Sequence, residues 1–398
     1  MFKHDTANSF INAQEKNMLS FLQSIIKLQS PSTKEKEVAE RVQKEMKTLG
    51  AKNVHFDTVG NVIGEFGSGR NCILLSAHMD TAGSGDVSKW SRDPFSGAME
   101  DGKIFGRGAG DNKGALAAMV YAGKLWSEIF PNANYRVIVG GTVLEEDADG
   151  YGMKVLLDEL QEKPKMVMIA KPTNGAIYRG HRGRMEVRID IKGESCHASA
   201  PSKGRNPIYK GGEVLLALKK LAEKLKKDAF LGEATLAPTM ISVDPNKFNT
   251  VPGMMTICVD RRLTMGETMD SALDEIKAAL PFPEISVSCF RYRNKAWTGN
   301  EFEVEKYFPV WSIPENHPIV TIAQKAGKSA FGKELPIGKW TVSTDGVGSM
   351  GHHSIPTIGY GPGERRAVDD FQSISDLLDA VKYYAAFCCT AEASMKLC

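Results

Sequence analysis

Leu74-Leu75-Ser76-Ala77-His78-Met79-Asp80-Thr81 is the stretch that decides the fold and centres the candidate site. Its apolar run predicts a buried strand that ends near His78. Residues two apart on a strand point the same way, so we expect His78 and Asp80 to enter one pocket. A carboxylate behind an imidazole fixes the tautomer and the orientation of the ring, which is common around a metal-bound His. By itself, His-x-Asp also fits a histidine that is satisfied in a core or a turn.

Length and composition indicate a globular protein of two domains. The chain has 398 residues, of which 42% are hydrophobic and 25% are charged. The formal net charge of +2 gives no reason to expect nucleic acid or an acidic membrane surface as a partner. We see no signal-peptide pattern and no apolar run near 18 residues, so we expect no membrane insertion. The seven scattered cysteines predict reduced thiols and a cytoplasmic location.

Two patterns of secondary structure divide the chain. Helices alternate with apolar strands through residues 1–183, which predicts an α/β domain with a mixed, largely parallel sheet. Residues 184–296 read as strand, helix, two strands, helix and a last strand at Ile285–Tyr292, the split βαβ arrangement of a small α+β domain. The α/β pattern resumes over 297–398, so we expect the second unit to be inserted into the first.

Further candidate side chains lie at the ends of predicted elements. Asp111 follows the glycine-rich stretch 106–110, where the backbone can approach a bound ion. Glu145 and Glu146 follow a predicted strand at its carboxyl end, where open α/β sheets bind ligands. In such a pair, one carboxylate can ligate a metal while the other takes a proton from water. An acidic run is also typical of a solvated loop, and His197 alone fits a surface or core histidine.

Taken together, these stretches resemble the co-catalytic zinc metallopeptidases of the aminoacylase, acetylornithine deacetylase and succinyl-diaminopimelate desuccinylase type, peptidase family M-twenty. Within that family, the sequence is most similar to the hydrolases linked to selenium metabolism. The matching strings are Ser76–Thr81, Gly106–Asp111, Glu145–Glu146, Gly180–Arg184, Ser195–Pro201, Asp260–Leu263 and Gly361–Gly363. The resemblance covers nearly the whole chain. It implies a three-layer, zinc-peptidase-like catalytic domain with an inserted ferredoxin-like dimerisation lid, and a homodimer.

The resemblance also implies roles at the metal centre. His78 would be a terminal ligand of one zinc, with Asp80 orienting its ring. Asp111 would bridge both zincs, and Glu146 would be a terminal ligand of the second. Glu145 would be the general base.

On the substrate side, the resemblance implies a carboxylate-containing small molecule. His197 would reach the oxyanion across the dimer. Arg261 and Asn249 would hold the substrate carboxylate, and the bidentate fork of Arg suits that task. The remaining substrate-side positions are Arg184, Gly361 and Gly363.

Two positions depart from the family pattern. Lys171 stands where the family has an acidic zinc ligand in an acid-Pro-Thr motif, and Val368 or a neighbour stands where it has a His after Gly-Pro-Gly. Each zinc would keep two protein ligands instead of the usual three, so we expect no zinc or partial zinc. Carbamylation of Lys171 would restore a carboxylate. The candidate replacement ligands are Asp369, Asp370, His352 and His353.

Two functions stay open at this point. The first is hydrolysis of an amide, acyl or ureido bond in a small amino-acid-derived carboxylate, with Lys171 polarising a carbonyl and Glu145 moving a proton. The alternative is a catalytically dead homologue that binds a small carboxylate or regulates a partner. Glu145, His197 and Arg261 favour the first reading. Lys171 and Val368 favour the second, or a metal-free version of the first.

Overall fold

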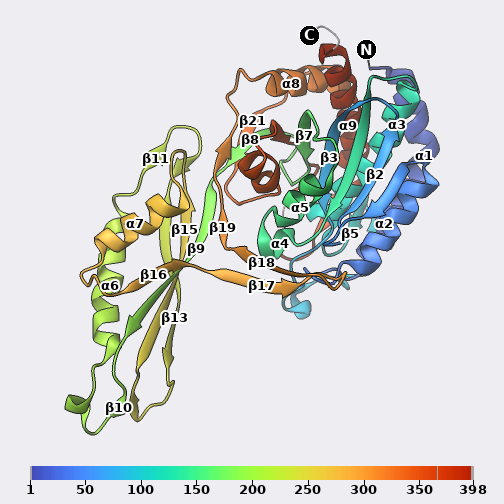
Figure 1. The fold of residues 1–398 in the computed structure, drawn as a ribbon. Helices are drawn as coiled ribbons and strands as arrows, with labels where there is room; N and C mark the ends of the chain where they lie inside the picture. The colour runs from blue at the N-terminus through green and yellow to red at the C-terminus, as the bar shows by residue number, and fades with distance from the viewer. Residues whose placement is uncertain (1, 365, 396–398) are drawn as a thin grey trace.

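The computed structural model describes residues 2–364 and 366–395, and a large sheet forms the centre of its main domain (Figure 1). The strands of this sheet are β1 (Lys52–Phe56), β2 (Val62–Gly67), β3 (Asn71–His78), β6 (Tyr135–Thr142), β7 (Met166–Ile169), β8 (Ile177–His181), β20 (Trp311–Ser312), β21 (Ile337–Trp340) and β22 (Thr357–Gly359). Their order is β1-β2-β6-β3-β7-β22-β8-β20, with β21 also paired to β8. The middle strands β6, β3, β7 and β22 are parallel, whereas β1, β2 and β20 pair antiparallel. The predicted α/β class is confirmed, with the parallel part in the middle of a mixed sheet.

Helices cover both faces of this sheet. They are α1 (His4–Ile26), α2 (Lys36–Thr48), α3 (Gly114–Ile129), α4 (Glu145–Ala148), α5 (Tyr151–Glu159), α8 (Pro318–Phe331) and α9 (Ile374–Met395). Gly123 of α3 packs against Val139, and Leu156 of α5 packs against Gly140, the next residue of β6. Adjacent strand residues point to opposite faces, so α3 and α5 lie on opposite sides. The main domain therefore has three layers.

A second sheet builds the inserted unit, which projects from the main domain in Figure 1. Its elements are β9 (Gly183–Lys192), α6 (Pro207–Ala222), β13 (Thr235–Asp244), β15 (Met254–Leu263), α7 (Met269–Ala279) and β16 (Ser286–Cys289). The strands pair antiparallel in the order β13-β15-β9-β16, which is the split βαβ topology. Buried side chains of this unit form their own core. We call residues 184–296 the lid, and these limits stay a prediction.

The return from the lid to the main domain differs from the expected strand at Ile285–Tyr292. β16 ends at Cys289, and the chain then forms a separate hairpin of β17 (Arg291–Lys295) and β18 (Glu301–Glu305). Arg291 pairs with carboxylates of the opposite strand at 3.1 and 3.2 Å, and such cross-strand pairs favour a hairpin of its own. After the hairpin, β19 (Tyr307–Phe308) pairs with β9 in the lid sheet.

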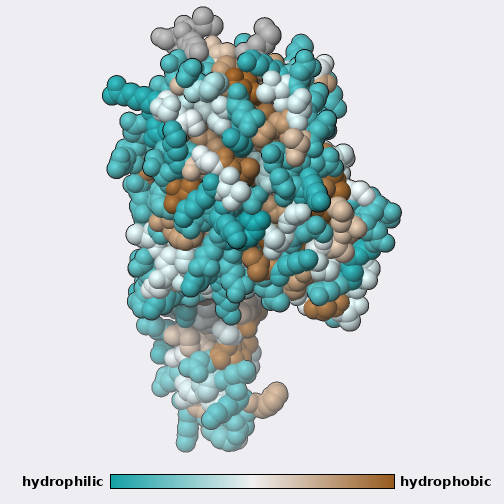
Figure 2. Space-filling model, turned by 90° about the vertical axis from the view of Figure 1, so that its right-hand side faces the viewer, coloured by the Kyte–Doolittle hydropathy of each residue, from teal (hydrophilic) through white to brown (hydrophobic). Residues whose placement is uncertain are grey.

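Short elements complete the described chain. They are η1 (Val87–Lys89), β4 (Met99–Glu100), β5 (Lys103–Phe105), η2 (Ala109–Lys113), β10 (Cys196–His197), η3 (Pro201–Lys203), β11 (Lys227–Asp228), β12 (Gly232–Glu233), β14 (Thr250–Val251), η4 (Val347–His352) and β23 (Phe371–Ser373). Figure 2 shows one face of the molecule, where hydrophilic side chains predominate and apolar ones form small groups. Among the described helices, none has the length and apolar composition to cross a membrane. The described cysteines are free thiols, and Cys398 lies outside the described residues.

Candidate catalytic centre

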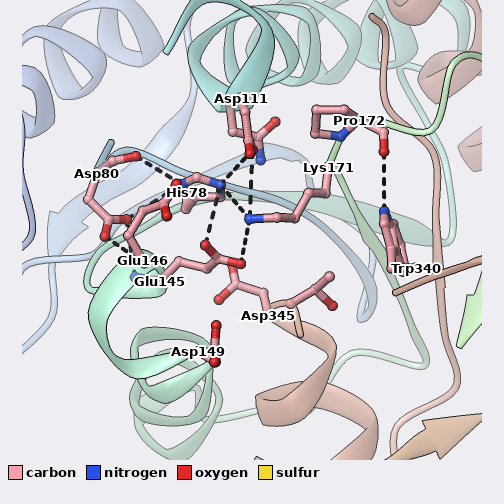
Figure 3. Close-up of polar contacts among 12 residues, drawn as sticks. His78, Asp80, Asp111, Glu145, Glu146, Asp149, Lys171, Pro172, Trp340 and Asp345 are labelled. Atoms are coloured by element: carbon pink, nitrogen blue, oxygen red, sulfur yellow. Dashed lines mark hydrogen bonds and ion pairs between the residues drawn. The ribbon is translucent and has the colours of Figure 1, made fainter. Parts of the chain in front are cut away.

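The candidate site lies at the carboxyl ends of three parallel strands (Figure 3). His78 ends β3, Glu145 opens α4 just after β6, and Lys171 follows β7. Because β6, β3 and β7 are adjacent and parallel, their carboxyl ends meet at one edge of the sheet. Asp111 reaches the same place from the turn η2 that precedes α3. The fold thus brings together side chains that are up to 93 residues apart in the chain.

Asp80 supports both the histidine and the glutamate pair. His78 Nδ1 lies 2.9 Å from the backbone carbonyl of Asp80 and 3.5 Å from its Oδ1. The Asp80 carboxylate accepts the backbone N–H groups of Glu145 at 3.1 Å and Glu146 at 2.9 Å, and the hydroxyl of Ser32 at 2.7 Å. Burial opposes the charged form, but these donors and His78 lower the pKa of Asp80. The buried carboxylate therefore fixes the turn that carries both glutamates.

Lys171 occupies the middle of the cluster. Its Nζ donates to Glu145 Oε1 at 2.7 Å and lies 3.2 Å from His78 Nε2 and 3.7 Å from Asp111 Oδ1. His78 Nε2 is also 3.1 Å from Asp111 Oδ1 and 3.6 Å from Glu145 Oε2. A neutral His78 can accept from Lys171 at Nε2, whereas a charged His78 donates from that atom to Asp111. The contacts of His78 Nε2 are therefore compatible with both the neutral and the charged imidazole.

Burial and charge shift the pKa values in this cluster. Burial alone would lower the pKa of Lys171, but the three surrounding carboxylates raise it above its usual range. Burial raises the pKa of Glu146 to about 7, and the charge of Glu145 adds to the effect. Burial and Glu145 also raise the pKa of Asp345 to about 7. An excess of buried carboxyl groups therefore surrounds one ammonium group.

Asp345 is a member of this region that the sequence analysis missed. It is buried, and its Oδ2 accepts the hydroxyl of Thr142 at 2.6 Å, at the end of β6 (Figure 3). The carboxylate follows β21 in the polar stretch 343–346. Because β21 runs antiparallel to β7, the edge rule that predicts the place of Glu145 does not predict that of Asp345.

The described residues offer one group of side chains that could hold a metal ion. The ligand atoms of His78, Asp111 and Glu146 lie within 4.8 Å of one another. An ion bonded to His78 Nε2 at about 2.1 Å would lie within about 5 Å of the Lys171 ammonium. A second ion would need ligands beyond this group. The residues present therefore do not fit a two-zinc centre.

The candidate replacement ligands have other places in the structure. Asp370 is buried and accepts the N–H groups of Gly108 at 2.9 Å and Gly110 at 3.1 Å, which fixes the loop before Asp111. Asp369 accepts from the backbone and hydroxyl of Ser91 at 2.8 and 2.9 Å. His353 lies 3.1 Å from Asp158. The metal-competent group includes none of these, nor His352, and Val368 is 40% exposed.

Arg261 does not reach the catalytic cluster. We expected it to hold the substrate carboxylate, but in this chain it pairs with two glutamates of the lid. Its side chain is fully buried in the lid, where its Nη2 contacts Glu267 at 2.5 Å and Glu275 at 2.9 Å. Alternation along β15 places Arg262 on the opposite face, where it pairs with Asp260 at 2.7 Å. Arg262 lies opposite Arg184 on the neighbouring strand β9, so these two guanidinium groups share one face of the lid sheet.

Arg184 links the lid to the helix of the glutamate pair. Its Nη1 donates to Asp149 Oδ2 at 2.8 Å, just after α4, and its Nε lies 3.8 Å from Asp260. Burial and Glu145 raise the pKa of Asp149 to about 6. A cation of the lid therefore borders the candidate centre.

His197 and Asn249 lie at the far tip of the lid. His197 is exposed, pairs with Thr250 across β10 and β14, and contacts Ser199 Oγ at 2.7 Å through Nδ1. The backbone carbonyl of Asn249 accepts from Ala198. In Figure 1, β10 is at the end of the lid that is remote from β7. Within one chain, the structure does not bring these residues to the catalytic cluster.

The Gly361–Gly363 loop packs behind Lys171. A Cβ at Gly361 would lie 2.1 Å from the carbonyl oxygen of Lys171, so only glycine allows this approach. The Gly361 N–H donates to Thr173 Oγ1 at 3.0 Å. Gly363 has a φ of +79°, which also favours glycine. The loop therefore fixes the backbone of Lys171.

A small pocket opens beside the cluster. Its volume is about 260 Å³, and its lining includes Asp111, Lys171, Tyr178, Lys339 and Trp340. Tyr178 and Trp340 meet edge to face with their ring centroids 5.1 Å apart. A larger cavity of about 690 Å³ lies elsewhere, beyond Gly363, and contains none of the clustered acids. The small pocket is the space from which a molecule can reach Lys171.

The comparisons with known proteins agree with this fold. The model of "Peptidase family M20/M25/M40" matches residues 74–390, and the chain belongs to this family. It is 40% identical over 375 residues to the uncharacterized protein YgeY of Escherichia coli K12, covering 93% of both chains. It is 32% identical over 244 residues to a succinyl-diaminopimelate desuccinylase of Magnetococcus marinus, covering 58% of this chain and 63% of that one.

Among solved structures, the chain is similar to a dinuclear metal-binding peptidase of the same family from Bacillus subtilis. The TM-score is 0.68 at 14% identity, and the match covers 97% of this chain and 99% of that one. This likeness concerns the fold. The predicted family and the predicted class of enzyme, a hydrolase of the peptidase and deacylase type, are confirmed.

Proposed function

We propose that this chain hydrolyses an amide, acyl or ureido bond in a small amino-acid-derived carboxylate. The observation that carries the proposal is the buried carboxylate of Glu145. The backbone N–H of Glu145 donates to Asp80 at 3.1 Å, and its carboxylate lies 2.7 Å from the ammonium of Lys171. A held carboxylate beside a fixed cation can accept a proton next to a polarised carbonyl.

The chemical step uses groups of this chain. Glu145 takes a proton from water as the water oxygen bonds to the substrate carbonyl carbon. The Lys171 ammonium stabilises the negative charge that develops on the carbonyl oxygen. The carbon–nitrogen bond then breaks, and Glu145 passes its proton to the leaving amine. Lys171 stays protonated throughout.

The substrate side supports a small anionic molecule. The pocket of about 260 Å³ beside Lys171 is at the small end for ligand sites, and its aromatic wall of Tyr178 and Trp340 suits a compact apolar group. Arg184 and Arg262, on the lid face, are the cations that we propose for the substrate carboxylate.

A substrate panel tests the proposal. N-acetyl, N-succinyl and N-carbamoyl amino acids and dipeptides are incubated with the protein, and released amine is measured by mass spectrometry. We expect turnover, and a loss of about 10²- to 10⁴-fold in Glu145→Gln. Glu128→Gln is the control, since Glu128 pairs with Lys124 on the surface of α3. Equal turnover in Glu145→Gln and the wild type would contradict the role of Glu145.

One observation favours a second candidate function, a binding homologue without turnover. Lys171 and Glu145 form a buried ion pair, and such a pair can hold a general base in a resting arrangement. Calorimetry with the same panel separates the two candidates. Binding without amine release in wild type and Glu145→Gln alike would favour the binding homologue.

We also propose a homodimer in which His197 of one chain approaches the centre of the other. Its exposure and its distance from the cluster of its own chain support this. Light scattering after size exclusion measures the mass, and mixed dimers of His197→Ala and Glu145→Gln chains would recover turnover at one site. The free cysteines fit the reducing cytoplasm, which is the location that we propose.

A further inference from the structure

We propose that the ammonium of Lys171 takes the place of a metal ion in this centre, so that the chain works with a fixed organic cation and without zinc. The proposal deepens the proposed function and rests on it for the reaction. The assignment of the cation itself rests on the arrangement of side chains. It predicts a metal-free centre in a fold whose Bacillus subtilis counterpart is described as binding two metals.

Nζ of Lys171 lies among the side chains that could hold an ion. It lies 2.7 Å from Glu145, 3.2 Å from His78 and 3.7 Å from Asp111, so it faces two of the three side chains that could hold an ion. A dication among these donors would share a buried space with an ammonium group. Like charges at this range disfavour each other strongly where water is excluded. The Lys171 ammonium therefore takes the place that a dication would need.

The backbone of Lys171 is held from two sides. The carbonyl of Ala170, the preceding residue, accepts from the Asn112 side chain, beside Asp111. On the other side, Gly361 packs directly on the Lys171 carbonyl. The side chain is only 6% exposed. The ammonium is thus built into the centre and is not a surface group that folded inward.

The position of a second ion also lacks a ligand. No described residue near Val368 replaces the missing histidine, because Asp370 holds the backbone of the glycine-rich loop and Asp369 holds Ser91. Val368 itself has no ligand atom. Both ion positions therefore lose a ligand, and only one of them receives a charged substitute.

A fixed ammonium selects a different ligand from a pair of zinc ions. It donates hydrogen bonds to a carbonyl or carboxylate oxygen and does not bind thiols or hydroxamates as zinc does. The neighbouring pocket gives such an oxygen access to Nζ. We infer that the centre binds the carbonyl or carboxylate oxygen of its ligand through Lys171, and that hydroxamate inhibitors of metallopeptidases bind weakly.

Metal content and zinc titration test the assignment. The full chain is purified from zinc-supplemented medium, analysed by elemental mass spectrometry, and titrated with zinc alone by calorimetry. The variants are Lys171→Glu, which restores a carboxylate, Lys171→Met, which removes the charge at similar length, and Lys154→Glu as a surface control. Lys154 pairs with Asp158 and is 41% exposed. Thermal unfolding of each variant checks that it is folded.

We expect zinc near zero in the wild type and in Lys154→Glu, and a gain of about 100-fold or more in zinc affinity in Lys171→Glu. One or two zinc ions per wild-type chain would overturn the assignment. This includes the case in which Lys171 is carbamylated and binds one of the ions. The wild-type measurement decides even if the variants do not fold. Zinc near zero without turnover of any substrate would leave the assignment standing and contradict the proposed hydrolysis. Stoichiometric zinc with turnover would support the proposed hydrolysis and contradict the assignment of Lys171 as the cation of the centre.

Discussion

Replacing Arg261 with Met separates a structural role from a substrate-binding role. The guanidinium is fully buried in the lid, and it contacts Glu267 at 2.5 Å, Glu275 at 2.9 Å and the carbonyl of Arg262 at 2.7 Å. The Glu267 side chain is 10% exposed, so Met would leave a buried carboxylate without its cation. Breaking such a pair costs about 3–5 kcal/mol. Glu275 is 39% exposed and adds little, because water screens it.

The loss is expected in the lid and not in the whole molecule. Hydrogen exchange of the β9 and β15 amides under native conditions reports the opening free energy of the lid, since a two-domain chain need not unfold in one step. The control is Arg262→Met, because Arg262 is 23% exposed and pairs with the half-buried Asp260. We expect a change below about 1 kcal/mol there.

A double variant refines the test. Glu267→Gln in the Arg261→Met background removes the stranded charge, and we expect it to recover part of the lost stability. A structural role for Arg261 is contradicted if Arg261→Met exchanges like the wild type. It is also refuted if that variant keeps its stability but loses binding of small carboxylates, because Arg261 would then serve the substrate.

Three further perturbations test other parts of the structure. Burial lowers the pKa of His181 to about 4, so the unfolded chain takes up a proton first as the pH falls below about 6.5. Stability should therefore fall by about 2–3 kcal/mol between pH 7 and 4.5, and His181→Phe should flatten this part of a denaturant–pH series. Gly361→Ala would put a methyl group 2.1 Å from the Lys171 carbonyl, and we expect a loss of about 1–3 kcal/mol in thermal unfolding, with no loss if the loop can move. Phe230 of the lid lies under the Arg179 guanidinium at 3.6 Å, so Phe230→Ala should raise amide exchange over 226–234, and unchanged exchange would show that this contact does not hold the lid.

The convergence of the acids could be predicted from the sequence because it depends on simple rules. Apolar strands ending at His78, before Glu145 and before Lys171 indicated a parallel sheet, and parallel neighbours have their carboxyl ends at one edge. Asp345 does not obey this rule, because the strand before it, β21, runs antiparallel to β7, and its carboxyl end does not meet those of β3, β6 and β7. The position of Nζ among three acceptors follows only from the packing of distant segments.

Arg261 and Arg262 are neighbours in the sequence, but they lie on opposite faces of β15. A shift of one residue therefore decides which of them is proposed to hold the substrate carboxylate. Ile257, Val259 and Leu263 are buried on one face of β15, and Arg261 has the same parity. The alternation was visible in the sequence, so the core position of Arg261 could have been predicted. Its partners could not, because Glu267 and Glu275 reach it from the loop before α7 and from α7 itself.

The two departures from the family pattern are related through the loop that follows Gly363. That loop has no ligand to offer at Val368, and it instead stabilises the turn before Asp111: Asp370 accepts from Gly108, and the carbonyls of the loop accept from Arg107. These hydrogen bonds therefore hold the turn that carries Asp111. On the other side, Lys171 neutralises part of the charge that two ions would have neutralised. The loss of one ligand from each ion position and the gain of one cation are what the proposed replacement of a metal ion by the Lys171 ammonium requires.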